Sequence, residues 1–113
     1  MDAKEFLQRY QSGDRDFSGV NMGGLKLIRA DLVEVNLTGA DLSKGNLILA
    51  YLNRAIFRGA NLEHIKLSGA NLDRANLSSA NFDLDDIGYA MDVTVAGTDS
   101  GLTFGTNAQD PNG

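Results

Sequence analysis

The chain has 113 residues, no cysteine and a formal net charge of −5 at pH 7. The lack of cysteine excludes a disulfide framework and thiol chemistry, and suits a reducing compartment. No apolar run approaches the ~20 residues that span a bilayer, and the start lacks the basic and apolar regions of a secretion signal. We therefore expect one small cytoplasmic domain without a membrane segment.

The first segment predicts a short amphipathic helix over residues 3–11. Three large apolar residues fall at helical spacing, namely Phe6, Leu7 and Tyr10. Asp2 can cap the start of the helix and Gly13 can end it. We expect residues 1–14 to cover the apolar interior and unpaired edge of the structure that follows. The alternative is a frayed polar leader, although three large apolar residues on one face are unusual in a disordered tail.

The rest of the chain is organised by a large apolar residue at every fifth position. In most cases a small residue, usually alanine, stands two places before it, and Asn or Asp stands between them, as in Ala60-Asn61-Leu62. On a helix, five residues advance the phase by about 140°, and on a flat strand odd spacing alternates sides. Only a chain that bends once per five residues can bury the whole set, which predicts a solenoid. Its members are Phe17, Met22, Leu27, Leu32, Leu37, Leu42, Leu47, Leu52, Phe57, Leu62, Leu67, Leu72, Leu77 and Phe82.

The pattern small-Asn/Asp-Leu/Phe-polar-Gly, in more than a dozen tandem copies, resembles the pentapeptide repeat proteins. The glycines lie where a turn favours a left-handed backbone, at Gly19, Gly24, Gly39, Gly59 and Gly69. The resemblance extends to short cyanobacterial members with a helical N-terminal cap. It implies an all-β solenoid, a right-handed quadrilateral β-helix over residues 15–89. Four pentapeptides would make one coil, giving about 3.5 to 4 coils stacked at the usual strand separation of ~4.8 Å.

That geometry stacks residues twenty positions apart on one face, so the large apolar residues form four inward columns. Leu42, Leu62 and Phe82, for example, should lie one above another. Burying each such side chain contributes about 1.5–3 kcal/mol before entropy is counted. The predicted core is therefore ample for a small domain.

A group of apolar residues falls at outward positions near the junction of the third and fourth faces. Its members are Ile28, Val33, Ile48, Leu49, Tyr51 and Ile56. Isolated exposed apolar residues need no explanation, but several stacked together indicate a surface for a partner. The alternative is that the helix or the C-terminal tail folds over them.

The register decays after residue 84. Residues 85–89 can form a last degenerate repeat with Ile87 inward, and residues 90–113 form an acidic, Gly-rich tail. This tail is either a weak hairpin or disordered. If it leaves the lower end open, the protein is either a monomer or a dimer formed by stacking end to end.

Motifs for chemistry are weak throughout. His64 is the only histidine and has no partner constellation. The tripeptide Asp99-Ser100-Gly101 matches that of aspartic proteases, but it occurs once and has no second lobe to share a proton. Three acidic residues close together in the sequence lack the spacing and glycine of a calcium loop, namely Asp83, Asp85 and Asp86. We expect no enzyme activity, no catalytic residue, no metal and no cofactor.

Two kinds of binding protein remain. Some proteins of the resembled family mimic DNA and bind type II topoisomerases such as gyrase, which needs a long negative surface. Residues 15–82 hold eight basic and six acidic residues, so the solenoid itself is slightly positive. Basic residues are not interleaved with aromatics, as nucleic-acid binding would favour. We therefore expect a non-enzymatic interaction or scaffold module that binds a protein, with the DNA mimic as the alternative and with no nucleic-acid or membrane partner.

Overall fold

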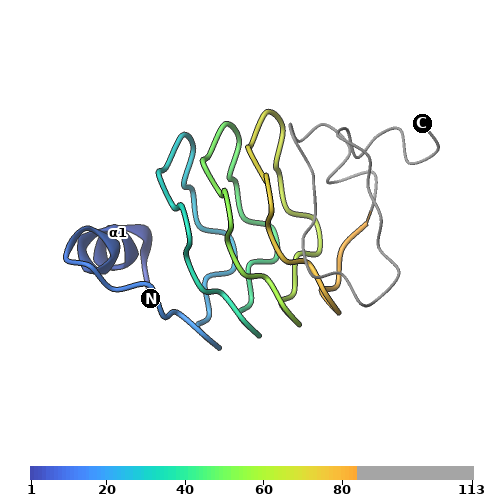
Figure 1. Ribbon diagram of the computed structural model, residues 1–113, viewed down its shortest axis with the longest axis horizontal. Helices are drawn as coiled ribbons and strands as arrows, with labels where there is room; N and C mark the ends of the chain where they lie inside the picture. The colour runs from blue at the N-terminus through green and yellow to red at the C-terminus, as the bar shows by residue number, and fades with distance from the viewer. Residues whose placement is uncertain (84–113) are drawn as a thin grey trace.

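The structure is a computed structural model that describes residues 1–83. The expected last repeat with Ile87 inward lies outside the described residues, and so does the tail of residues 90–113. The described part consists of one helix followed by a stack of coils, with the helix at the N-terminal end of the stack (Figure 1).

The helix, α1, spans Ala3–Gln11, as the spacing of its apolar residues predicts. Its N-cap is Asp2, whose side chain accepts a hydrogen bond from the Glu5 N–H at 2.8 Å. This bond satisfies one of the backbone donors that every helix start leaves open. Beyond Gln11 the chain turns at Gly13, where φ is +108°, a conformation that glycine adopts at little cost.

Residues 16–83 form coils with a period of twenty residues. Isolated parallel bridges join positions twenty apart, from Asp16 with Asn36 to Asn61 with Asn81. We call residues 16–35 the first coil, 36–55 the second and 56–75 the third. Each coil hydrogen-bonds to the next through its backbone, and Figure 1 shows the coils lying side by side.

Each coil turns at four corners, and each corner is a hydrogen-bonded β-turn. In the turn Leu27–Ala30 the Ala30 N–H donates to the Leu27 carbonyl at 3.1 Å. The third residue of these turns has a φ between +58° and +74°, as in a type II turn. Glycine is not required there, because Arg29 and other non-glycine residues adopt the same φ. The backbone bonds between coils hold them in this conformation, as with the Arg29 N–H on the Ile48 carbonyl at 2.9 Å.

Where a repeat has Asn or Asp before its inward residue, that side chain also supports a corner. The Asn36 side-chain oxygen accepts from the backbone N–H of Thr38 at 3.0 Å and from its hydroxyl at 2.6 Å. Asn76 accepts from the Ser78 N–H in the same way at 2.9 Å. Such bonds from an Asx side chain to the residue two further on stabilise turns locally.

The core is the interior of the coils. Every predicted inward residue from Phe17 to Leu77 is buried, with at most 3% of its surface exposed. Phe82, also predicted in the core, is only partly buried and packs against it. At the other end the Phe6 ring of α1 is fully buried and meets the Phe17 ring edge-on, with centroids 4.5 Å apart. This contact joins α1 to the first coil.

Candidate functional site

Among residues 1–83, three large hydrophobic side chains are exposed, and all three lie about the same corner. The exposed fraction is 50% for Ile28, 41% for Leu49 and 54% for Tyr51. Ile48, which is partly exposed, directly precedes Leu49 and lies twenty positions after Ile28. We call these four residues the apolar corner.

Turn geometry positions the apolar corner. Ile28 is the second residue of the turn that starts at Leu27, and Ile48 holds the same place in the next coil. The backbone bond between Arg29 and the Ile48 carbonyl keeps the two turns adjacent. Tyr51 follows the second turn directly and bridges to Asp31 of the first coil.

Leu49 has an unusual backbone for a large aliphatic residue, since its φ is +62°. The other non-glycine residues with positive φ in the described chain are polar or charged. The Leu49 side chain lies over Gly69 of the third coil, and a Cβ added to Gly69 would be 2.6 Å from Leu49 Cδ2. Gly69 therefore makes room for an apolar side chain on the outside of the stack.

Val33 and Ile56, which the sequence places in the same candidate patch, lie about the next corner. Val33 is inside the turn Leu32–Val35, and Ile56 follows the equivalent turn of the second coil. Both are partly exposed. Tyr51 lies between the two corners, because it follows the turn that ends at Ala50 and precedes the turn that starts at Leu52. The Val33 carbonyl accepts a hydrogen bond from the Tyr10 hydroxyl of α1 at 2.8 Å.

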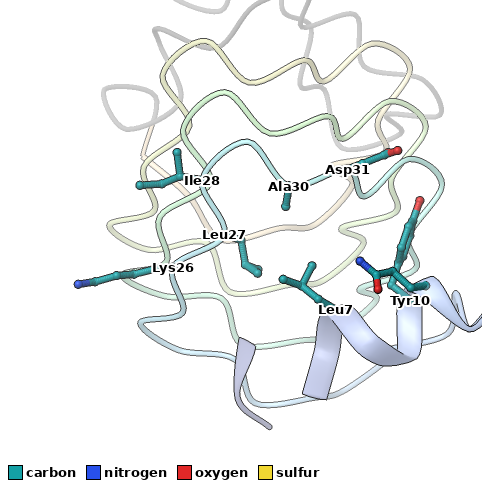
Figure 2. Close-up of a pocket in the computed structure, with 8 residues that line it drawn as sticks. Leu7, Tyr10, Lys26, Leu27, Ile28, Ala30 and Asp31 are labelled. Atoms are coloured by element: carbon teal, nitrogen blue, oxygen red, sulfur yellow. The ribbon is translucent and has the colours of Figure 1, made fainter. Parts of the chain in front are cut away.

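A cavity of about 360 Å³ opens between α1 and the first coil. We call it the α1 groove, and Figure 2 shows Leu7 of α1 pointing toward Leu27 and Ala30 while Lys26 extends away. The sequence predicts a helix that covers the first coil but not this groove. The length of the predicted helix was the available signal, because nine residues span only about 14 Å and cover the first coil only in part. The groove is lined by Leu7, Tyr10, Gln11, Lys26, Leu27, Ile28, Ala30 and Asp31.

The titratable groups of the described chain include three whose pKa is shifted. Burial raises the pKa of Tyr10. The hydroxyl of Ser18 and then its N–H lower the pKa of Asp16, and Ser43 does the same for Asp41. These shifts come from the turn hydrogen bonds and from the packing of α1.

A metal-binding cluster and a membrane-spanning helix are both absent from the described residues. No three His, Cys, Asp or Glu side chains there are grouped so that they could hold a metal ion. No helix among them has the length and apolarity to cross a membrane. His64 is an exposed side chain whose Nε2 lies 3.6 Å from Glu63 Oε1.

The family model for pentapeptide repeats matches residues 16–54 and 55–83 in eight copies, which is more than half of the chain. The chain belongs to the pentapeptide repeat family. The family resemblance of the sequence motif is thereby confirmed. No curated protein matches the chain.

Solved structures of pentapeptide repeat proteins resemble this one. HetL from the cyanobacterium Nostoc sp. strain PCC 7120, which is involved in heterocyst differentiation regulation, is 29% identical with a TM-score of 0.54. The match covers 74% of this chain and 48% of HetL, so the chain spans about half the length of HetL. A pentapeptide repeat protein from the thylakoid lumen of Arabidopsis thaliana is 25% identical with a TM-score of 0.59, over 86% of this chain and 82% of its own. The fold is accordingly a right-handed β-helix solenoid.

Proposed function

We propose that this pentapeptide repeat protein is a non-enzymatic interaction or scaffold module that binds a protein partner through the apolar corner. The observation that carries the proposal is the gathering of Ile28, Leu49 and Tyr51, each at least 41% exposed, about one corner. Grouped apolar side chains on an otherwise polar surface are typical of protein-binding sites.

The chemistry of these side chains supports the proposal. Tyrosine is enriched among the residues that dominate binding energy, because its ring buries a large area while its hydroxyl stays hydrogen-bonded. Leu49 holds a backbone conformation that costs a non-glycine residue roughly 1–3 kcal/mol and yet exposes an aliphatic side chain. Binding of a partner would explain why a strained and exposed position holds leucine.

The similar structures are consistent with this role. HetL is described as involved in regulation, and pentapeptide repeat proteins generally act through interactions with other proteins. No observation favours the alternative, a DNA mimic that binds a type II topoisomerase, because residues 15–82 carry more basic than acidic side chains. A mimic would need the reverse.

A pull-down from native lysate with mass spectrometry tests the proposal. The double variant Ile48→Glu with Tyr51→Glu places two carboxylates on the apolar corner and should remove the partners that the unchanged protein captures. Arg58→Glu is the control, since it changes net charge by the same amount at the opposite corner of the stack. Partners that survive the double variant, or that are lost equally with Arg58→Glu, would show that this corner is not the site.

Three further features belong to the proposal. We take α1 as the cap of the first coil because of the Phe6–Phe17 contact. We take the protein as a monomer or an end-to-end dimer.

We place it in the cytoplasm because the sequence has no cysteine. Fractionation of native cells followed by immunoblotting checks the compartment, and recovery from a luminal fraction, as for the Arabidopsis protein, would contradict it.

A further inference from the structure

We propose that the α1 groove is a backbone-pairing site, in which a segment of a partner protein lies along the open backbone edge of the first coil and makes the same turn at its corner. The segment would place one large apolar side chain in the groove, against Leu7 and Ala30. This goes beyond the proposed function, because it rests on backbone groups and on the groove, whereas the apolar corner presents side chains on the outer face. The two sites share only Ile28.

The second coil shows how such an edge is paired when a strand lies against it. The Leu27 N–H donates to the Asn46 carbonyl at 2.7 Å, and the Arg29 N–H donates to the Ile48 carbonyl at 2.9 Å. In return, the Asn46 N–H donates to the Leu25 carbonyl at 2.8 Å. We call the backbone edge of a coil that faces the N-terminal end of the stack its leading edge. The first coil thus supplies hydrogen-bond partners for the leading edge of the second.

The same groups of the first coil, twenty positions earlier, lack such a strand. Within the described residues, nothing pairs with the N–H or the carbonyl of Lys26, with the Ile28 carbonyl, or with the N–H and carbonyl of Asp31. All three residues are exposed and all three line the α1 groove. An open edge of this kind is a template for an added strand.

The N-terminal segment occupies the edge on either side of this window. The Tyr10 hydroxyl donates to the Val33 carbonyl at 2.8 Å, and the terminal amine of Met1 lies 3.5 Å from the Asn21 carbonyl. These contacts show that groups from outside the coils can satisfy the edge. They leave the stretch of residues 26–31 open to a partner.

The groove also offers an apolar seat. Leu7 and Tyr10 of α1 form one wall, and Leu27 and Ala30 form the floor (Figure 2). Its volume of about 360 Å³ lies at the small end of the range of about 300–1,000 Å³ for ligand sites. Leu7 already covers Leu27, which is only 3% exposed, whereas Leu7, Tyr10 and Ala30 are partly exposed. An added segment would therefore pack its inward residue against these three side chains.

The chemistry of the partner follows from this template. The segment must run parallel to residues 25–30 of the first coil and bend where they do, at the turn Leu27–Ala30. Two of its N–H groups, two residues apart, would donate to the carbonyls of Lys26 and Ile28, and one of its carbonyls would accept from the Lys26 N–H. A large aliphatic or aromatic residue must stand at the first of the two donors.

A nine-residue synthetic peptide that copies residues 25–33, Leu-Lys-Leu-Ile-Arg-Ala-Asp-Leu-Val, serves as the probe. In the protein this stretch already pairs with a leading edge in the required register. Fluorescence anisotropy of the labelled peptide with the full chain should show saturable binding. N-methylation at the peptide's Leu27 and Arg29 removes the two donors and should weaken binding by about tenfold or more, given the usual worth of a backbone hydrogen bond.

The matched control is the same peptide N-methylated at its Lys26 and Asp31, whose N–H groups would face away from the edge. It should bind within about twofold of the unmodified peptide. Equal loss for both methylated peptides, or no binding of the unmodified peptide at millimolar concentration, would overturn the proposal. Selective loss with methylation at Lys26 and Asp31 would also overturn it, because that pattern belongs to the opposite end of the stack.

Protein variants separate this site from the apolar corner. Leu7→Glu, with its fold checked by circular dichroism, should weaken peptide binding because a carboxylate then faces the apolar floor. The double variant Ile48→Glu with Tyr51→Glu should leave peptide binding unchanged even if it abolishes partner capture. Sedimentation showing that the peptide dissociates a dimer of the free protein would assign the edge to a second copy of this chain and overturn the proposal.

Discussion

Single positions show how strongly the stack overrides local preference. Arg29, Arg54 and His64 hold φ values near +60°, which a side chain normally disfavours. Each lies at the third place of a turn whose backbone is hydrogen-bonded to neighbouring coils, as for the Arg54 N–H on the Asp73 carbonyl at 2.8 Å. The stack therefore tolerates strain that an isolated turn would avoid.

Replacing one of these residues by glycine should relieve the strain. We expect Arg54→Gly to raise the free energy of unfolding by about 0.5–1 kcal/mol, since about 1–2 kcal/mol of left-handed strain is removed and part is offset by chain entropy. Arg58→Gly is the control, because Arg58 is also exposed at a corner but does not have a positive φ. It should lower that free energy by about 0.5–1 kcal/mol. Urea unfolding of both variants decides, and a change of the same sign in both would contradict this account.

The Asp residues of the turns should make stability depend on acid pH. The Ser43 hydroxyl, 2.7 Å from Asp41, and the Ser43 N–H lower the pKa of Asp41 from 3.8, and Ser18 acts likewise on Asp16. Because the folded pKa lies below the unfolded one, this contribution is complete above the unfolded value and is lost as pH falls through the folded value. The magnitude is small because both carboxylates face solvent.

The double variant Asp16→Asn with Asp41→Asn checks that pH dependence. Asparagine keeps the acceptor oxygen, as Asn36 does toward Thr38, but it does not titrate. The Tm of the variant should fall less than that of the unchanged protein between pH ~5 and pH ~2, while the two should be similar at neutral pH. Parallel Tm curves over this range would show that these carboxylates contribute nothing to acid sensitivity.

Among the elements, α1 is held to the core by its apolar side, where Ala3, Leu7 and Tyr10 pack beside the buried Phe6. The buried Phe6 ring packs against the Phe17 ring, and the Arg9 guanidinium lies 5.0 Å from the centre of the Phe17 ring. The Tyr10 hydroxyl donates to the Val33 carbonyl. Helices of nine residues are marginal in isolation. The helix should therefore depend on docking for its stability.

Two variants of α1 should separate the apolar from the polar part of docking. Phe6→Ala should cost about 3–5 kcal/mol of docking free energy, because it leaves a cavity against the core. Tyr10→Phe keeps the ring and loses one hydrogen bond, so its cost should be about 1 kcal/mol. Amide hydrogen exchange in α1 measures both, and the amides of the second coil provide the internal reference. Equal exchange in the two variants would show that Phe6 does not anchor the helix.

The sequence predicts these elements well where one physical constraint dominates. Burial at every fifth position determines the inward register, and the residues from Phe17 to Leu77 are buried as that register requires. Phe82 departs from it, since it is only partly buried, although it packs against the core. The two ends of α1 were predictable from Asp2 and Gly13, because helix capping depends on local geometry alone.

The candidate sites were harder to predict because they depend on how distant segments meet. The sequence placed Val33 and Ile56 with the apolar corner, but turn positions put them about the next corner. The α1 groove depends on where Leu7 lies relative to Leu27, and no local pattern encodes that placement. Whether the six residues of the sequence-based patch bind a partner remains a prediction.

In the molecule as a whole, both proposed binding sites depend on a stack in which positions twenty apart are neighbours. Parallel bridges and backbone hydrogen bonds repeat that register along residues 16–83. The same register places Ile28 beside Ile48 and leaves the leading edge of the first coil open. Both proposed binding surfaces therefore follow from one geometric rule.

Disulfide formation in this cysteine-free chain tests that rule most directly. Arg54→Cys with Arg74→Cys places thiols twenty positions apart on adjacent coils, where the usual strand separation of ~4.8 Å falls within disulfide geometry. Arg54→Cys with His64→Cys places them ten positions apart, at opposite corners of the coil. We expect mass spectrometry after mild oxidation to find an intramolecular disulfide in the first variant and free thiols in the second. Disulfides in both, or only in the second, would contradict the stacked register.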